Sequence, residues 1–412
     1  MKAFERFIKY ASYHTTSNEE NEACPSSEGQ RQLAKYLVDE LLALGLSDAR
    51  VDAGGYVYAS LPKNCEEECN AIGFIAHLDT SPEAVGKDIK LNLVDYKGGD
   101  VLLNPDKKIW LRVKDYPYLS DYIGHHLLTS DGTTLIGADD KAGIAEILTA
   151  LEKIIASGKK HGRISVAFTP DEEIGRGANL FDVKAFGADY AYTVDGGAIG
   201  ELEYENFNAA SATVTVHGVS IHPGSAKDRM KNASRIASEF DSMLNADEIP
   251  ERTEGYEGFH HLLSMTGEIE LAKMNYIIRD HSMEKFEEKK EEFKRCAEAL
   301  NEKYGDGTIE LLLRDSYFNM REVIEKNMFI VKRAENAMLA CGITPIVVPI
   351  RGGTDGARLS FMGLPCPNIC TGGENFHSRF EFISVESMEK ISDIIVKMIE
   401  NAVTDGKAEV TL

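Results

Sequence analysis

Hydrophobic residues recur along the chain with two spacings, one typical of helices and one typical of buried strands. Helical spacing in the first part of the chain predicts helices over residues 4–13, 30–46 and 139–157. Continuous apolar runs predict buried strands over residues 71–77, 163–169 and 188–194. Residues 81–134 show neither pattern, and we expect irregular structure there. Since strands alternate with helices, the expected fold class is α/β, with a mixed, largely parallel sheet sandwiched by helices.

The pattern changes after residue 207 and returns after residue 320. Between these points the predicted order is strand 209–216, helix 228–244, strands 263–271 and 276–281, helix 282–304 and strand 308–314. This β-α-β-β-α-β order is that of a ferredoxin-like α+β unit. The earlier alternation of helical spacing and apolar runs then resumes, and it predicts helix 322–340, strands 345–350 and 367–371, and helix 384–401. We therefore expect one α/β domain at residues 1–207 and 321–412, interrupted by a small domain at residues 208–320.

Charge and composition narrow the choice of partners. The 412 residues include 45 Lys and Arg against 67 Asp and Glu, a formal charge of −22, which disfavours nucleic acid and anionic membrane as partners. The chain begins without a signal-peptide pattern and contains no apolar run of about 20 residues. Its seven Cys include no CxxC pair, so we expect reduced thiols and a cytoplasmic location.

Histidines and carboxylates cluster where predicted strands end or a helix begins. These residues are His77 and Asp79, Asp139 and Asp140, Asp171 to Glu173, Asp195, and His377. Each has a simple structural explanation by itself: a hydrogen-bonded strand-end His, a helix cap, a solvated turn, an Asp-Gly turn or a surface His. Together they fall at the carboxyl ends of strands of one predicted sheet, where the ligands of open α/β sheets gather.

The chemistry of this set favours a metal-dependent hydrolase. His and carboxylate ligands without thiolates suit Zn, Mn or Co, and two such ions can activate a water molecule. A neighbouring carboxylate that is not a ligand could carry the proton from that water to the leaving amine. The chain contains no GxSxG, HExxH, Walker A or GxGxxG motif, so the competing chemistries lack a signal.

Several of these strings resemble one known family. HLDTS, LIGADDKAGIAEI, TPDEEIGRG, VDGG, HPGSAK, RGGTDGA and GGENFH, in this order, are similar to motifs of the M20 metallopeptidases, and most closely to those of its tripeptide aminopeptidases. The similarity extends over essentially the whole chain. It implies a zinc-peptidase-like catalytic domain, an inserted lid or dimerisation domain, and release of the N-terminal residue from tripeptides.

The resemblance also implies a role for each motif residue. Two zinc ions, replaceable by Co²⁺ or Mn²⁺, would be bound by His77, Asp139, Glu173, Asp195 and His377, with Asp139 bridging. Glu172 would be the general base, Asp79 would orient His77, and the Asp139–Asp140 peptide would be cis. Small peptides would be contacted by His222, Arg279, Arg351 and Asn375. His222 would steady the oxyanion of the tetrahedral intermediate, and the two arginines would bind the substrate carboxylate.

Other functions remain open on the sequence alone. A dipeptidase or an N-acyl amino acid deacylase of the same family would share the metal residues. A catalytically silent binding protein on the same scaffold is disfavoured, because Glu172 and every ligand position are present. Many relatives dimerise through the small domain, but the sequence does not decide between a monomer and a homodimer. Closure of the inserted domain as a lid would exclude water.

Overall fold

The computed structural model describes residues 1–412, which form two compact units. Unit 1 comprises Met1–Tyr204, Met320–Val348 and Thr354–Leu412, and unit 2 comprises Glu205–Asn319 and Pro349–Gly353. The short segment Pro349–Gly353 lies outside the predicted insert. It joins unit 2 because the Ile350 amide donates a hydrogen bond to the Glu205 carbonyl, at 2.8 Å. Arg351 therefore belongs to unit 2.

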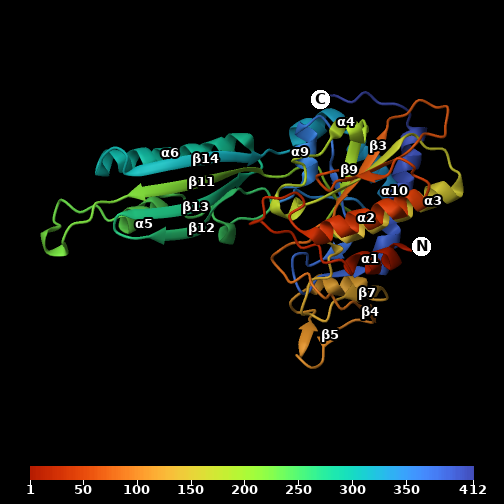
Figure 1. The fold of residues 1–412 in the computed structure, drawn as a ribbon, viewed down its shortest axis with the longest axis horizontal. Coiled ribbons are helices and arrows are strands. Elements are labelled where there is room, and N and C mark those ends of the chain that lie inside the picture. Colours follow the sequence, from red (N-terminus) through yellow and green to blue (C-terminus); the bar gives the residue numbers. More distant parts are fainter. The chain divides into compact units, whose positions relative to one another are not determined.

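The centre of unit 1 is an eight-stranded sheet (Figure 1). Its order is β1 (Arg50–Val51), β2 (Val57–Leu61), β8 (Ile164–Thr169), β3 (Ile72–His77), β9 (Tyr190–Val194), β16 (Asn368–Ile369), β10 (Glu201–Glu203) and β15 (Ile346–Val347). The central strands β8, β3, β9 and β16 are parallel, whereas β2 and β10 run antiparallel to their inner neighbours. This confirms the predicted mixed, largely parallel sheet. Every residue of β3 and β8 is buried, since helices cover both faces.

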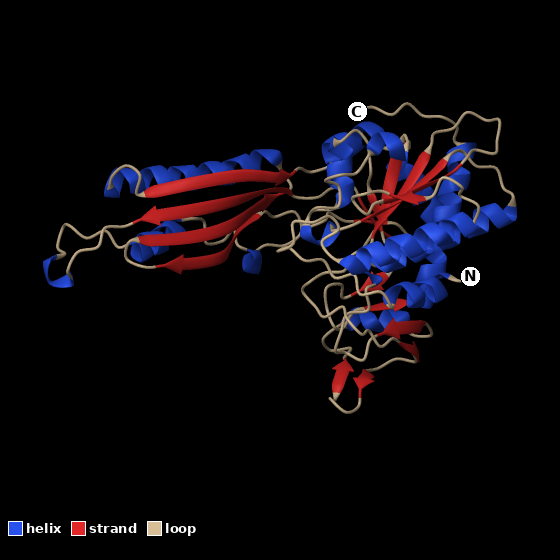
Figure 2. Ribbon diagram, viewed as in Figure 1, coloured by secondary structure: helices blue, strands red, loops and turns tan.

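Helices form a layer on each face of this sheet (Figure 2). The larger layer contains α1 (Ala3–Ala11), α2 (Glu28–Ala43), α3 (Ala138–Ser157), α8 (Phe329–Ala340) and α10 (Val385–Thr404). The opposite face is covered by α4 (Val183–Phe186) and α9 (Asp355–Phe361), whose Phe186 and Leu359 share a core with Ile75 of β3. The remaining short helices are α7 (Arg321–Ile324), η1 (Pro117–Tyr122), η2 (Glu172–Ile174) and η5 (Glu325–Asn327). No helix has the length and apolar character required to cross a membrane.

The prediction of irregular structure over residues 81–134 is wrong. This segment contributes β4 (Asn92–Asp95) and β7 (His126–Thr129) to a second sheet with β17 (Gly373–Glu374) and β18 (Phe382–Ser384). It also forms the hairpin of β5 (Val101–Asn104) and β6 (Ile109–Leu111). These strands are only two to four residues long, and β7 pairs with a strand more than 250 residues away. Such pairing leaves no periodic signal in the local sequence.

Unit 2 has the predicted ferredoxin-like organisation. Its elements follow in the order β11 (Asn208–His217), α5 (Ala233–Met243), β12 (Phe259–Gly267), β13 (Leu271–Asp280), α6 (Met283–Tyr304) and β14 (Ile309–Tyr317), with two short turns, η3 (Pro223–Ser225) and η4 (Pro250–Arg252). The strands form an antiparallel sheet of order β12-β13-β11-β14, and both helices pack on strands β11 and β13. The predicted strand over residues 263–271 is displaced, because the hairpin turn closes with the Glu268 amide donating to the Leu271 carbonyl. This turn lacks the Gly, Pro or Asn that usually marks one.

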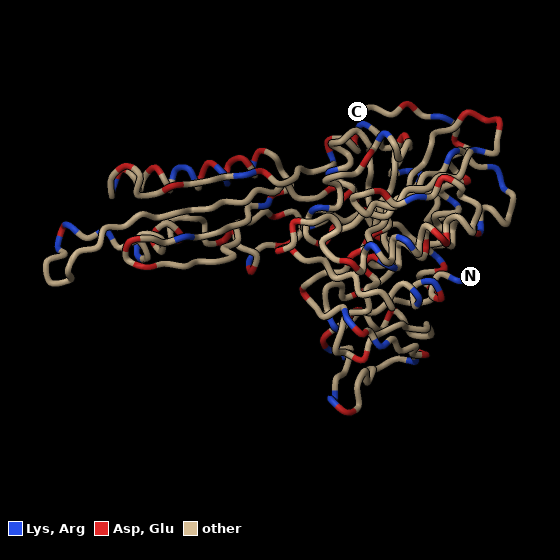
Figure 3. The backbone as a smooth tube through the Cα atoms, viewed as in Figure 1, with Lys and Arg blue, Asp and Glu red and all other residues tan.

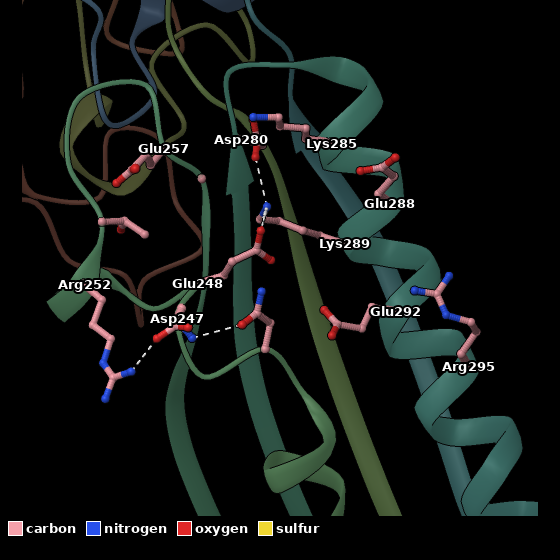
Figure 4. A pocket seen from close by; sticks show the side chains of 13 residues that line it. Asp247, Glu248, Arg252, Glu257, Asp280, Lys285, Glu288, Lys289, Glu292 and Arg295 are labelled. Carbon is pink, nitrogen blue, oxygen red and sulfur yellow. Dashed lines mark hydrogen bonds and ion pairs between the residues drawn. The ribbon is translucent and has the colours of Figure 1, made fainter.

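The charged helix α6 is amphipathic rather than solvated on all sides. Acidic and basic residues alternate along it (Figure 3), while Phe286, Phe293 and Leu300 are buried in the core of unit 2. A cavity of about 570 Å³ lies between α6 and the segment before β12 (Figure 4). Its buried Lys289 lies 2.9 Å from Glu248 and 3.0 Å from Asp280. Because these charges are paired with one another, we assign them to the stability of unit 2.

Replacing Lys289 by methionine is expected to lower the free energy of unfolding by about 3 kcal/mol, because the fully buried Asp280 carboxylate loses its cation. Urea unfolding followed by circular dichroism measures the change. Lys285→Met is the matched control, since Lys285 lies one turn earlier on α6 and is exposed. Equal unfolding midpoints for the two variants would show that the ion pair contributes nothing.

Candidate metal centre

The candidate ligands converge because their strands are parallel neighbours. His77 is the last residue of β3, Glu172 and Glu173 begin the turn η2 that follows β8, and Asp195 directly follows β9. Strands β8, β3 and β9 lie side by side in the sheet, so their carboxyl ends share one edge. The hydrophobic runs that predict the strands therefore also place these acids and the histidine together.

Asp139 lies between two histidines at the start of α3. One of its carboxylate oxygens, Oδ1, is 2.8 Å from His77 Nε2, and the other, Oδ2, is 3.3 Å from His377 Nε2. The Asp139–Asp140 peptide is cis, as the family resemblance implied. Gly143 lets this end of the helix approach the sheet closely, because a Cβ at this position would lie 2.1 Å from the carbonyl oxygen of Val194. A single carboxylate thus faces both histidines.

Each histidine has a second carboxylate of its own. His377 Nε2 is 2.8 Å from Glu173 Oε2, and His77 Nε2 is 3.5 Å from Asp195 Oδ1. The five predicted ligands therefore form two groups that share Asp139. Asp140 is also near His77, although its Oδ2 atom accepts a hydrogen bond from the His77 amide at 2.9 Å. One of its oxygens thus anchors the end of β3.

These residues have the properties of a metal site. Ligand atoms of His77, Asp139 and Glu173, and those of His77, Asp140 and Asp195, lie within 4.8 Å of one another. Glu173 Oε1 and Asp140 Oδ1 are buried without a hydrogen-bond partner, an arrangement that a cation would satisfy. Imidazole and carboxylate donors without a thiolate suit Zn²⁺, Mn²⁺ or Co²⁺.

The pKa values of the cluster also indicate that it would bind a cation. Burial lowers the pKa of His377, but hydrogen bonds with Asp139 and Glu173 outweigh it and raise this pKa to about 11. Burial, reinforced by the Asp139 charge, raises the pKa of Glu173 to about 8. The isolated cluster therefore retains protons to compensate its carboxylates. A divalent cation would replace those protons on binding.

Asp79 connects the first histidine to the turn that carries the predicted base. Its two carboxylate oxygens accept the backbone amides of Glu172 and Glu173, at 3.0 and 3.1 Å. Asp79 Oδ1 also lies 3.4 Å from His77 Nδ1, the ring nitrogen other than the Nε2 that faces Asp139. Burial raises the pKa of Glu172 well above its ordinary value, and the nearby Asp195 charge adds to this effect. A carboxylate with a raised pKa is suited to accept a proton near neutral pH.

Two positioning residues near the centre were not identified from the sequence. The buried Glu381 carboxylate accepts hydrogen bonds from the amides of Ile136, Gly137 and Asp139, at 2.7, 2.9 and 3.1 Å. Gln30 donates to the buried Asp171 carboxylate at 2.7 Å and so anchors the turn that precedes Glu172. A single acid between two phenylalanines, as at Glu381, could have been recognised as a buried carboxylate, but its partners could not.

The predicted substrate residues His222 and Arg279 belong to unit 2. His222 is exposed in the loop between β11 and α5, and its Nδ1 accepts the Gly224 amide at 3.2 Å. Its other ring nitrogen, Nε2, therefore carries a proton in the neutral imidazole and can donate a hydrogen bond. Arg279 donates through Nη1 to the Arg351 carbonyl at 3.1 Å, and its buried Nε has no partner.

Arg351 and Asn375 are both engaged in structural hydrogen bonds. The Arg351 guanidinium donates to the carbonyls of Thr253, Gly255 and Glu257 and lies over the Phe207 and Phe259 rings. The Asn375 amide, in unit 1, accepts from the Tyr118 hydroxyl and donates to the Phe380 carbonyl. Substrate contacts by these two residues stay a prediction.

Comparisons with known proteins agree on one group of enzymes. Residues 126–401 match the Peptidase_M20 model, described as peptidase family M20/M25/M40. The chain is 56% identical to a protein named Peptidase T from Caldanaerobacter subterraneus subsp. tengcongensis, over 97% of this chain and 98% of that protein. A tripeptidase from Staphylococcus aureus has a similar structure, with a TM-score of 0.78, 20% identity and 98% of each chain covered.

A third similar protein is a Bacillus subtilis protein described as a dinuclear metal-binding peptidase of the M20 family. Its TM-score is 0.64 at 14% identity, with 98% of this chain and 99% of that chain covered. At identities of 20% and 14%, the Staphylococcus aureus and Bacillus subtilis structures support the assignment of the fold.

Proposed function

The chain belongs to peptidase family M20/M25/M40, as its motifs predicted, and we propose that it is a metallo-aminopeptidase that releases the N-terminal residue of tripeptides. The observation that carries the proposal is the Asp139 carboxylate, which faces His77 and His377 with its two oxygens. Near-full-length identity to a Peptidase T and the fold shared with a tripeptidase support the substrate class. The proposal includes two Zn²⁺ ions per subunit, with Co²⁺ or Mn²⁺ as substitutes, and a cytoplasmic location.

In this proposal His77 and Asp195 would hold one ion, His377 and Glu173 would hold the other, and Asp139 would be a ligand shared by the two groups. When bound, the two ions polarise the peptide carbonyl and lower the pKa of the attacking water. The Glu172 carboxylate takes the proton of that water and transfers it to the leaving amine nitrogen. Asp79 holds the backbone of Glu172 and the His77 ring in place through the contacts described above.

We further propose that unit 2 supplies substrate-binding side chains. His222 donates from Nε2 to the oxyanion that develops on the carbonyl oxygen, and Arg279 and Arg351 bind the substrate carboxylate. The backbone carbonyl of Arg351 accepts a hydrogen bond from Arg279, and the Arg351 guanidinium holds the loop at residues 253–257. Asn375 is the fourth predicted contact. Recognition of both the α-amino group and the terminal carboxylate would measure peptide length. A monomer and a homodimer are both compatible with this proposal, and analytical ultracentrifugation distinguishes them.

Zinc-loaded protein is expected to release Met from Met-Gly-Gly and to leave Gly-Gly, tetra-alanine and N-acetyl-Met-Gly-Gly intact, as measured by chromatography of the products. The dipeptide and tetrapeptide mismatch the spacing between the amine and carboxylate sites, and acetylation removes the positive amine. Glu172→Ala protein, incubated in parallel, controls for contaminating peptidases. Cleavage of the dipeptide would identify a dipeptidase, and cleavage of the acetylated peptide would identify a deacylase. Either result would overturn the tripeptide assignment while retaining the metal site.

A further inference from the structure

The segment that carries His377 is held by tyrosines from a distant part of the chain. The Tyr118 hydroxyl donates to Asn375 Oδ1, and the Tyr122 hydroxyl donates to Glu374 Oε1 at 2.8 Å. Both tyrosines belong to the short helix η1, more than 250 residues earlier in the sequence. The Tyr122 ring also packs edge-on against Phe382, with 5.2 Å between ring centroids. The segment at residues 374–382 therefore contacts η1 at both of its ends.

The conformation of this segment requires such support. Asn375 and His377 have φ angles of 59° and 57°, in the left-handed region that residues with a Cβ rarely adopt. Each residue held there costs on the order of 1 kcal/mol unless its surroundings favour the conformation. The Asn375 amide spans the bend by donating to the Phe380 carbonyl at 3.0 Å, and its Oδ1 is fixed by Tyr118. Tyr118 thus stabilises the residue that shapes the turn around His377.

The same segment also reaches the bridging aspartate. Glu381 accepts the amide hydrogens of the backbone that presents Asp139, while His377 lies 2.8 Å from Glu173. One short segment is therefore tied to η1 on one side and to the metal-binding residues on the other. The tyrosine hydroxyls hold Glu374 and Asn375, beside His377, whereas Glu381 lies at the other end of the segment. His377 is the only predicted ligand on this segment, so a displacement confined to residues 374–377 would alter one of the two ligand groups selectively.

We propose that Tyr118 and Tyr122 are positioning residues that preorganise His377 and thereby set the affinity of the second metal-binding group, formed by His377, Glu173 and Asp139. Neither tyrosine is among the candidate ligands, so both act through the 374–382 segment. The proposal rests on the two-ion function proposed above. It assigns a role to η1, a helix that contains none of the motifs shared with the family. Loss of a hydrogen bond that orients a ligand typically weakens metal binding by about 10- to 100-fold.

Stepwise Co²⁺ titration of the metal-free, full-length protein tests the proposal, with visible absorption and calorimetry as readouts. In Tyr118→Phe and Tyr122→Phe we expect one binding step to lose about 10-fold in affinity and the other step to stay unchanged. The double variant should lose more. Tyr116→Phe is the matched control, because the Tyr116 ring packs on Phe380 but its hydroxyl forms no hydrogen bond.

Three outcomes of this titration distinguish a positioning role from no role, from a general structural role, and from a failure of the two-ion function. Unchanged affinities in both tyrosine variants, with two ions bound by the wild type, would overturn the positioning role alone. Equal weakening of both steps, together with a lowered urea midpoint, would show a general structural role instead. Fewer than two ions bound by the wild type would overturn the two-ion function and the positioning role with it. At saturating Co²⁺, a positioning role predicts recovery of kcat in both variants, with an unchanged KM in Tyr122→Phe, whose lost hydrogen bond is to Glu374 and not to the predicted substrate contact Asn375.

Discussion

Replacement of Glu172 by glutamine is expected to lower kcat for tripeptide hydrolysis by roughly 10³-fold, since proton transfer by a positioned general base contributes about 10²- to 10⁴-fold. Glutamine keeps the size of the side chain but cannot take the proton from the attacking water. The backbone amide of residue 172 still donates to Asp79 in this variant, so the turn and the position of the neighbouring Glu173 are retained. Steady-state kinetics on Met-Gly-Gly measures kcat, and metal analysis of the same samples measures ion content.

The metal content decides how the loss of activity is interpreted. An inactive variant that still binds two ions supports the base assignment. An inactive variant that has lost an ion would show that Glu172 is a ligand, and a variant that keeps more than a tenth of the wild-type kcat would assign the base elsewhere. Glu20→Gln, an exposed acid on the same unit, is the control for general effects of the substitution.

The second large effect is expected at Asp139. Its replacement by asparagine leaves both histidines without their shared carboxylate, so we expect weaker binding of both ions. Because metal stabilisation of the transition state contributes several kcal/mol, kcat at fixed metal concentration should fall by roughly 10³-fold or more. Co²⁺ titration and kinetics together measure both changes.

Asp140→Asn is the matched comparison for this prediction. Asp140 accepts the His77 amide with Oδ2, and an asparagine carbonyl can accept the same hydrogen bond. We expect only the binding step that involves His77 to lose metal affinity, by about 10-fold. If Asp140→Asn instead weakened both steps and Asp139→Asn weakened one, the bridging role would belong to Asp140.

Much of the architecture could be predicted from local sequence patterns. The apolar runs of β3, β8 and β9 are continuous because both faces of the sheet are covered, and that continuity identified the strands. His77, Glu172 and Asp195 follow those strands, and parallel neighbours bring such residues to one edge. The β-α-β-β-α-β order of unit 2 is likewise visible in the change of hydrophobic period.

The sequence did not determine how the candidate site is supported. Glu381 binds the backbone before α3, Gln30 binds Asp171, and Tyr118 binds Asn375 across 257 residues of sequence. Gln30 and Tyr118 look like ordinary polar residues in their local context. The flanking phenylalanines mark Glu381 as a buried carboxylate, but no pattern identifies the amides that it binds. The same limit applies to β7, which pairs with β18, and to Pro349–Gly353, which joins unit 2.

The sequence by itself thus determined the types of element, the chemistry of the candidate ligands and their convergence at one edge of the sheet. Only the tertiary structure decided which buried acids anchor backbone and what holds the His377 segment. The physical reason is that periodicity reports how each element buries its own apolar face. Hydrogen bonds between side chains and distant backbone depend on the meeting of segments whose separation no local pattern records.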